Sequence, residues 1–344
     1  MVKRRTGLLD IAKQVGVSKA TVSRYLNTPD LVSPSLQKRI STVIETLGYL
    51  PNKVPNMLSN AKSHAIGVFL PSVTSQIFTD VLQGIETITD QNGYQVMIAH
   101  TGRYKDKEEM RLRSLLSYNI DGLILTERNH SPASIKMIQL ANIPIVEIMD
   151  SVTPFIDMAV GYDNFQASKN MVDRMIKANK KHIVYLSTQL NERGVLRNKG
   201  YEAAMAEHHL ETFAILSKEL PSYALGEQLL HQVLKEYPQV DGIFCCNDSL
   251  ALGVLFECQR LNIAVPQQIA IAGFHGYDIG QSVNPKLASV LTPRFEMGKI
   301  AAEMLLKRLN GKIIPSNVVE LPVKYIEGES ITTSPITVNE SLRL

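Results

Sequence analysis

The chain has 344 residues, of which 44% are hydrophobic and 20% are charged, and its formal net charge is +3. This length is too great for one hydrophobic core and predicts a globular protein of two or three domains. We expect no membrane span and no secretory signal, and the odd, clustered cysteines Cys245, Cys246 and Cys258 indicate buried thiols in a reducing cytoplasm.

Positive charge is concentrated at the N-terminus. Residues 1–62 contain ten Lys or Arg and three Asp or Glu, whereas the remainder contains 26 basic and 30 acidic residues. A basic segment attached to a mildly acidic body is suited to neutralising the phosphates of a nucleic acid. A solvated basic face without a partner is the alternative.

Residues 9–26 show the pattern of a helix-turn-helix. Gly16 can adopt the left-handed conformation that ends a helix, and Ser18 is a favourable N-cap for a second one. In this motif the second helix enters the DNA major groove with its N-terminal residues first. An ordinary helical hairpin is the alternative, because spacing alone does not decide between them. The apolar positions that define the two helices are Ile11, Ala12 and Val15, then Ala20, Val22, Tyr25 and Leu26.

A third helix is predicted between Ser33 and Gly48. Ser33 is a suitable N-cap, proline follows at the first helical position, and Gly48 can end the helix. Lys38 and Arg39 lie on its polar side, where they contact either a DNA backbone or solvent. The apolar face that closes a three-helix domain over residues 1–48 consists of Ile40, Val43, Ile44 and Leu47.

Residues 49–63 are predicted to form a hinge helix or linker. Pro55 can open a short helix that runs to about Asn60. The exposed Met57-Leu58 pair has the character of the apolar wedges that separate base steps from the minor groove. Packing on the body as a connector is the alternative. The tail, residues 331–344, has no heptad repeat, so nothing beyond a dimer is predicted there.

From His64 onward, apolar strands alternate with amphipathic helices such as 78–92 and 108–118. This alternation predicts parallel sheets that are covered on both faces. Asp121-Gly and Asp241-Gly begin similar apolar runs 120 residues apart, which predicts two similar doubly wound halves facing each other across a cleft. The expected strands are 65–70, 95–99, 122–125, 144–148, 158–160, 183–186, 242–246 and 269–272.

Seven short strings together resemble the lactose/galactose-repressor family of bacterial transcription regulators over nearly the whole chain. More narrowly, Leu70-Pro-Ser, Asn119-Ile-Asp-Gly-Leu-Ile-Leu-Thr-Glu and Ala272-Gly-Phe-His-Gly-Tyr-Asp-Ile-Gly280 resemble the gluconate- and idonate-utilisation repressors. The family strings are Asp10-Ile-Ala, Gly16-Val-Ser, Thr21-Val-Ser-Arg24, Gly48-Tyr-Leu-Pro-Asn52, Asp121-Gly-Leu-Ile, Asn247-Asp248 and Gly273-Phe274.

The resemblance implies a cytoplasmic homodimeric repressor without a cofactor, released from operator DNA by a small effector. It implies a helix-turn-helix head and an α/β body like that of periplasmic binding proteins, with two doubly wound parallel-sheet subdomains. The implied divisions are a head at 1–48, a hinge at 49–63, a body at 64–330 and a tail at 331–344. Within the body, the N-subdomain takes about 64–162 and 293–321, and the C-subdomain about 163–292 and 322–330.

The resemblance also implies which residues contact DNA. Arg can read guanine bidentately, whereas Ala20 offers only a methyl contact. Gly7 stands where the family often has a hydroxyl N-cap, so one cap or phosphate contact is in doubt. Lys19, Ala20 and Arg24 would face base edges, Thr21 and Ser23 would lie near phosphates, Leu58 would be the minor-groove lever, and Lys38, Asn52 and Lys53 complete the set.

In the cleft, Arg197 stands at a position from which the family clamps its effector, and pairing with a carboxylate is the natural geometry. Most relatives carry an aspartate at position 275, whereas His275 can donate to an anion or partly neutralise it. Both features favour a sugar acid such as gluconate. Asp150 or Glu147 would hold hydroxyls, and the sequence leaves open which one faces the cleft. The implied effector residues are Ser75, Gln76, Phe78, Asp150, Tyr162, Asp163, Arg197, Tyr223, Asn247, His275 and Thr292.

Other interpretations remain at this stage. His275 could be structural, and a metal site with Asp278 lacks a third ligand at suitable spacing. A kinase or isomerase would need a catalytic base and a phosphate loop, which the sequence does not show. A sugar-binding transport protein would share the two-lobed body but needs a secretory signal and no basic head. Within the family, the effector could be another sugar or a sugar phosphate.

Overall fold

The computed structural model describes residues 6–50, 62–152, 154–188 and 192–332. These residues form two compact units, Met1–Ser63 and His64–Leu344, which are considered separately. No helix in the described part of the chain is long and apolar enough to cross a membrane. The predictions for Asn52, Lys53, Pro55, Met57 and Leu58, and for the tail beyond residue 332, lie outside the described residues.

The described part of the first unit contains α1 (Leu8–Val15), α2 (Lys19–Asn27), the 3-10 helix η1 (Pro29–Leu31) and α3 (Pro34–Leu47). Gly16 ends α1 with φ 77°, and the Ser18 side chain accepts a hydrogen bond from the Thr21 N–H at 3.1 Å. The predicted helix-turn-helix and third helix are therefore confirmed, with the turn formed by the two residues that the sequence singled out.

The head is held by a small apolar core and by one long side chain. Ile11, Val22 and Ile40, one from each α-helix, are completely buried. The Arg39 guanidinium donates to the Val15 carbonyl at 2.6 Å, which satisfies the C-terminus of α1 and ties it to α3. Gly7 provides no side-chain cap for α1, but its N–H donates to Asp10 at 2.8 Å.

The second unit contains two six-stranded sheets within the described residues, here called the N-lobe and the C-lobe. The strand order is β11-β5-β4-β3-β1-β2 in the N-lobe and β12-β10-β9-β8-β6-β7 in the C-lobe. All pairs are parallel except β10 with β12. The N-lobe strands are β1 (Ala65–Leu70), β2 (Gln95–His100), β3 (Gly122–Leu125), β4 (Ile145–Ile148), β5 (Met158–Gly161) and β11 (Val318–Glu320). The C-lobe strands are β6 (Ile183–Thr188), β7 (Phe213–Ser217), β8 (Gly242–Cys245), β9 (Ala270–His275), β10 (Ala288–Leu291) and β12 (Lys324–Ile326).

Helices cover both faces of each sheet, as uninterrupted buried strands require. The chain passes between the lobes after β5, after β10 and after β11, so each lobe is assembled from separate segments. The N-lobe helices are α5 (Gln76–Gln91), α6 (Lys105–Ser117), α7 (Pro132–Ala141) and α12 (Arg294–Leu309). The C-lobe has α8 (Asn164–Lys177), α9 (Glu192–Glu207), α10 (Tyr223–Glu236), α11 (Asp248–Arg260) and the 3-10 helix η2 (Asp278–Gln281).

The repeated Asp-Gly pairs have the same structural task in both lobes. The carboxylate of Asp121, just before β3, accepts a hydrogen bond from the His64 N–H at 2.9 Å. That of Asp241, just before β8, accepts from the N–H groups of Lys181 and His182. Each aspartate therefore fixes the chain that enters the neighbouring central strand, β1 or β6.

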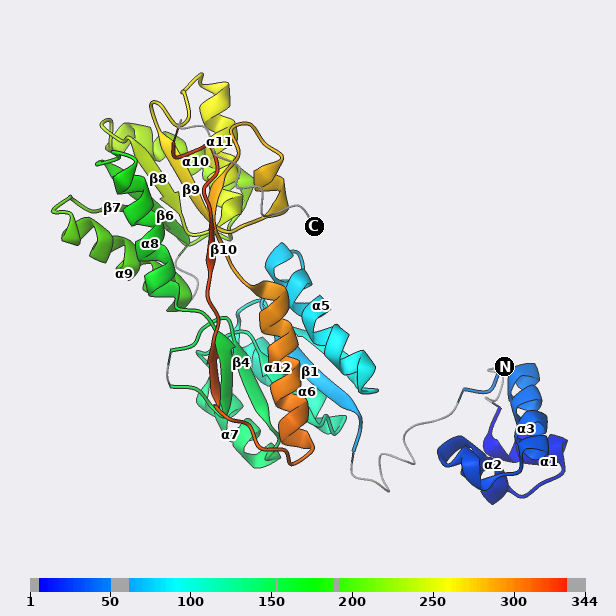
Figure 1. Ribbon diagram of the computed structural model, residues 1–344. Helices are drawn as coiled ribbons and strands as arrows, with labels where there is room; N and C mark the ends of the chain where they lie inside the picture. The colour runs from blue at the N-terminus through cyan, green and yellow to red at the C-terminus, as the bar shows by residue number, and fades with distance from the viewer. Residues whose placement is uncertain (1–5, 51–61, 153, 189–191, 333–344) are drawn as a thin grey trace. The chain divides into compact units, whose positions relative to one another are not determined.

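Helices α5 and α12 lie side by side on one face of the N-lobe sheet (Figure 1). Their backbones meet at two glycines. A Cβ atom at Gly84 would lie 2.1 Å from the Phe295 carbonyl oxygen, and one at Gly298 would lie 2.1 Å from the Val81 carbonyl oxygen. Because both obstacles are backbone atoms in packed helices, no larger residue fits there without moving a helix.

Gly84→Ala should therefore destabilise the body by about 1–3 kcal/mol, measured as the free energy of unfolding in urea. Gln83→Ala, at an exposed neighbouring position of α5, is the matched control and should change that free energy by less than about 0.5 kcal/mol. Equal effects of the two variants would contradict the close helix contact.

Candidate functional site

Helix α2 presents a polar and basic face on the first unit. Lys19, Ala20 and Arg24 are exposed, whereas Val22 points into the core and is completely buried. Thr21 and Ser23 are half-buried, and the Thr21 hydroxyl lies 2.9 Å from that of Ser18. The first turns of α2 thus combine accessible side chains with the positive end of the helix dipole, which suits a groove lined by phosphates.

The two basic residues on α3 differ in their surroundings. Lys38 is exposed and makes no ion pair among the described residues. The guanidinium of Arg39 is bonded to the α1 carbonyl of Val15, so its main task is structural. For Lys38, contact with a phosphate of the DNA backbone therefore stays a prediction, with contact to solvent as the alternative.

In the second unit, Arg197 of α9 is the centre of a buried polar cluster. Its Nε donates to Asn164 Oδ1 at 2.9 Å, and its Nη2 donates to the Tyr162 hydroxyl at 3.2 Å. Its Nη1 donates to the Cys246 carbonyl at 2.8 Å and to His275 Nε2 at 3.1 Å. The guanidinium also lies 3.8 Å from the ring centre of Phe274. All these partners are neutral.

His275 is a neutral acceptor in this cluster. Arginine can only donate, so His275 Nε2 carries no proton, and Nδ1–H lies 3.4 Å from the Thr292 hydroxyl oxygen. Burial, together with the charges of Arg197, Arg294 and Arg193, holds the pKa of His275 well below its usual value. The histidine therefore supplies no positive charge in this arrangement, in contrast to the expectation that it partly neutralises an anion.

Other implied effector residues lie around this cluster. Gln76 Nε2 donates across the lobes to Asp278 Oδ1 at 3.0 Å, and Ser75 is the N-cap residue that precedes α5. Asn247 precedes α11 and accepts from the Leu250 N–H at 3.0 Å as its N-cap.

Three implied residues are placed elsewhere by their contacts. Phe78 is buried in the N-lobe core, and Asp163 caps α8 by accepting from the Gln166 N–H at 2.8 Å. Tyr223, at the start of α10, is 43% exposed and lies against Phe256. The structure thus brings together Tyr162, Arg197, His275 and Thr292, but not these three.

A charged cleft opens where β2, β3 and β4 end, opposite the start of α9. Asp150 lines this cleft, whereas Glu147 is turned away and accepts a hydrogen bond from the Ile156 N–H. Burial raises the pKa of both carboxyl groups. Of the two acids left open by the sequence, Asp150 is the one that faces the cleft. The cationic lining residues are Arg103, Lys105, Arg128 and Arg193, and the acidic ones are Glu108, Glu127, Asp150 and Glu192.

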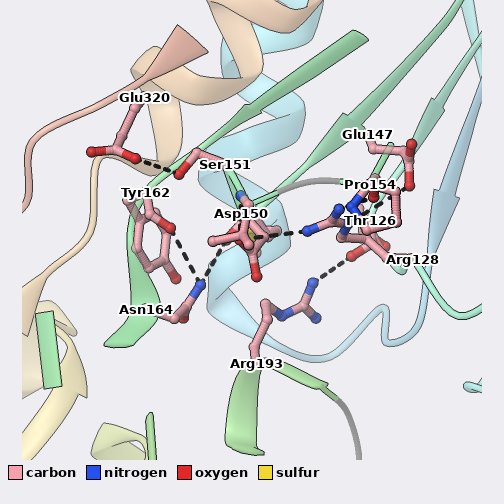
Figure 2. A network of polar contacts seen from close by, with 12 residues as sticks. Thr126, Arg128, Glu147, Asp150, Ser151, Pro154, Tyr162, Asn164, Arg193 and Glu320 are labelled. Atoms are coloured by element: carbon pink, nitrogen blue, oxygen red, sulfur yellow. Dashed lines mark hydrogen bonds and ion pairs between the residues drawn. The ribbon is translucent and has the colours of Figure 1, made fainter. Parts of the chain in front are cut away.

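Two arginines make polar contacts at the edges of this cleft. Arg128 lies 3.6 Å from Asp150 and 3.9 Å from Glu147, and its Nη2 donates to the Pro154 carbonyl (Figure 2). Arg193 reaches from the C-lobe to the Thr126 carbonyl (Figure 2). It also donates to Glu127 Oε1 at 2.8 Å. The lobes are therefore joined by polar contacts at the edge of the cleft.

Sequence reasoning did not single out Arg103, Arg128, Arg193 or Asn164. Arg193 precedes Arg197 by one helical turn, so both point from the same face of α9, and this spacing was an available signal. Arg103 and Arg128 come from loops after strands, where composition alone gives no direction. No cluster of three or more potential metal ligands occurs among the described residues.

An exposed basic helix face in one unit and a charged cleft between two lobes in the other define a ligand-responsive DNA-binding regulator. Residues 7–52 match the family of bacterial regulatory proteins called lacI, and residues 172–331 match the periplasmic binding protein-like domain. The chain is 51% identical over 331 residues to the HTH-type transcriptional regulator GntR of Escherichia coli K12, covering 96% of this chain and 100% of the relative. It belongs to the lacI family of bacterial transcription regulators.

Two further comparisons agree. The chain is 42% identical over 332 residues to the HTH-type transcriptional regulator IdnR of E. coli K12, covering 96% of this chain and 100% of the relative. A crystal structure of a LacI-family transcriptional regulator from Silicibacter pomeroyi matches with a TM-score of 0.89 at 30% identity, over 95% of this chain and 99% of that one. All three proteins are named as transcriptional regulators, which agrees with the regulatory function predicted from the sequence.

The first residue of α11, Asp248, leads to a prediction about pH. Its carboxylate is fully buried and accepts hydrogen bonds from the Ser289 hydroxyl and the Tyr277 N–H. Burial raises the pKa of Asp248 to about 7, against these two bonds and the charge of Arg294.

Because the folded protein retains a proton that the unfolded chain loses near pH 4, the contribution of Asp248 to stability is present below that pH and is lost as pH rises towards 7. Between pH 4 and 7, this group should lower the free energy of unfolding of the wild type by at most about 1.4 kcal/mol for each pH unit. Thermal unfolding of Asp248→Asn should not show this decrease. The exposed Asp106→Asn should follow the wild type. Parallel curves for all three proteins would rule out the raised pKa.

Proposed function

We propose that this protein is a homodimeric cytoplasmic repressor that leaves its operator when gluconate or a related sugar acid binds between the lobes. The observation that carries the proposal is that two arginines, one in the lining of the cleft and one beside it, have no carboxylate partner among the described residues. Arg103 and Arg197 have no carboxylate within ion-pair distance among the described residues, although Arg197 is nearly completely buried. Because buried charges are costly without a counter-charge, an anion is the ligand that this cleft suits best.

The names of the relatives support the same class of ligand. The gluconate- and idonate-type strings of the sequence agree with the 51% and 42% identity to GntR and IdnR. A sugar acid offers both a carboxylate for a guanidinium and hydroxyls for Asp150, Tyr162 and Thr292. A neutral sugar would leave the unpaired positive charge as it is.

On DNA, two heads of a dimer would place their α2 helices in successive major grooves of a near-palindromic site, about 34 Å apart. The hinge residues 49–63 would pair and open the minor groove between them. The effector shifts the equilibrium only by binding one arrangement of the lobes better than the other. The contacts between the lobes at Arg193, Gln76 and Arg294 are the ones that such a shift would alter.

Arg24→Ala should weaken binding to a site selected from random duplexes by the wild-type protein. Loss of a bidentate base contact predicts about 1–3 kcal/mol, measured by fluorescence anisotropy, with little change on unrelated DNA. Arg113→Ala, an exposed arginine on α6 of the N-lobe, is the control. A uniform loss on all sequences would assign Arg24 to phosphates instead.

The Arg197→Ala protein should still bind the selected DNA site, but gluconate should no longer release it from that site. The reason is that the buried polar cluster beside the cleft loses the guanidinium at its centre. The measurement is anisotropy of labelled DNA over a gluconate titration. Beforehand, thermal shifts of the wild type with gluconate, idonate, their keto and phosphorylated relatives, and glucose identify the ligand that raises the melting temperature. Normal release of Arg197→Ala would refute the assignment of this cleft.

A further inference from the structure

The turn between β2 and α6 places in the cleft an arginine that has no charged partner among the described residues. Arg103 lines the cleft and is half-buried, and among the residues that the structure describes it has neither a hydrogen bond nor an ion pair from its side chain. Its φ of 66° is left-handed, like that of Gly102 (φ 60°), and the Tyr104 N–H closes the turn on the Thr101 carbonyl at 3.2 Å. An arginine rarely adopts this conformation, so the turn holds it there.

Three of the four acidic residues that line the cleft are already engaged, and the fourth, Glu192, is exposed. Glu127 is bonded to Arg193 at 2.8 Å, Asp150 lies 3.6 Å from Arg128, and Glu108 lies 2.9 Å from His130. Burial lowers the pKa of Arg103, with Glu127 opposing this effect and Arg193 adding to it. The guanidinium therefore lies in partly dehydrated surroundings, and no residue in the described part of the chain serves as its own counter-ion.

Arg197 is differently placed. A carboxylate binds arginine most strongly through two parallel N–H···O bonds. At Arg197 the Nε and Nη1 groups are already bound to Asn164, the Cys246 carbonyl and His275. A carboxylate would have to displace these neutral partners, whereas the donors of Arg103 are available without any displacement.

We propose that Arg103 binds the carboxylate of the sugar acid and sets the preference for an acid over a neutral polyol. The Tyr162, Arg197, His275 and Thr292 cluster binds the hydroxyl groups. This inference rests on the proposed function of the cleft and names the residue that recognises the carboxylate. Arg103 belongs to the N-lobe and Arg193 to the C-lobe, and their charges repel each other. A carboxylate beside Arg103 weakens this repulsion and favours the closed arrangement.

The test is titration calorimetry of the full-length protein with D-gluconate and with D-glucitol, which has a hydroxymethyl group in place of the carboxylate. The wild type should prefer gluconate. Arg103→Gln should lower the affinity for gluconate about 10- to 100-fold and bring it close to that for glucitol. Arg103→Lys keeps the charge without the planar fork, so it should retain part of the preference, and it decides the matter if Arg103→Gln does not fold.

Two further variants separate the roles. Arg197→Gln should weaken both ligands by a similar factor and so keep the ratio of the two affinities. Arg113→Gln, exposed on α6, should behave as the wild type. The proposal is overturned if Arg103→Gln keeps the wild-type ratio, or if Arg197→Gln alone abolishes it. Absence of gluconate binding by the wild type would instead refute the proposed effector, and the role of Arg103 with it.

Discussion

The Arg197 guanidinium binds together C-lobe residues and Tyr162, which lies where the chain passes from the N-lobe to the C-lobe after β5. It bonds Tyr162 and Asn164 beside the passage that follows β5, and His275 at the end of β9. Because every partner is neutral, the network is satisfied in hydrogen bonds but not in charge. In the low-dielectric surroundings of this cluster, next to Arg103 and Arg193, any counter-charge would interact strongly with the guanidinium.

The contacts that join the lobes differ in kind from those within them. Each lobe has its own apolar clusters, which pack helices against buried strands. Between the lobes, the described contacts include polar ones, such as Arg193 to Glu127, Gln76 to Asp278 and Arg294 to the His275 carbonyl. Polar contacts can be exchanged with modest changes in free energy, whereas packed cores resist deformation. A ligand in the cleft can thus shift two rigid bodies relative to each other.

Local patterns in the sequence predicted much of the fold. Gly16, Ser18 and the Ser33-Pro34 pair act within one helical turn of their own position, so they located the helices of the head. All eight expected strands are present, but β7, β10, β11 and β12 were missed. Strands β11 and β12 have three residues each and β7 is partly exposed, so tertiary pairing rather than an apolar pattern defines them.

The cleft was predictable only in part, for a related reason. His275 and Thr292 lie together because parallel strands end at one edge of a sheet, and Arg197 comes from α9, the helix that follows another strand of that sheet. The protonation of His275 depends on arginines from α9 and α12, which no local pattern reveals. The position of Arg103 in the cleft depends on a left-handed backbone conformation at a non-glycine residue. The position of Asn164 beside Arg197 depends on where the chain passes from one lobe to the other.

The passage of the chain from the C-lobe back to α12 and β11 has a consequence for biosynthesis. On the ribosome, the head emerges complete and can fold first, whereas the N-lobe sheet appears long before the helix that covers it. Until residues 294–320 have been translated, the face of α5 that contains Gly84 lacks its partner, and the apolar side chains beside it stay open to the surrounding solution. The N-lobe therefore remains incomplete, with exposed apolar surface, while the whole C-lobe is being synthesised.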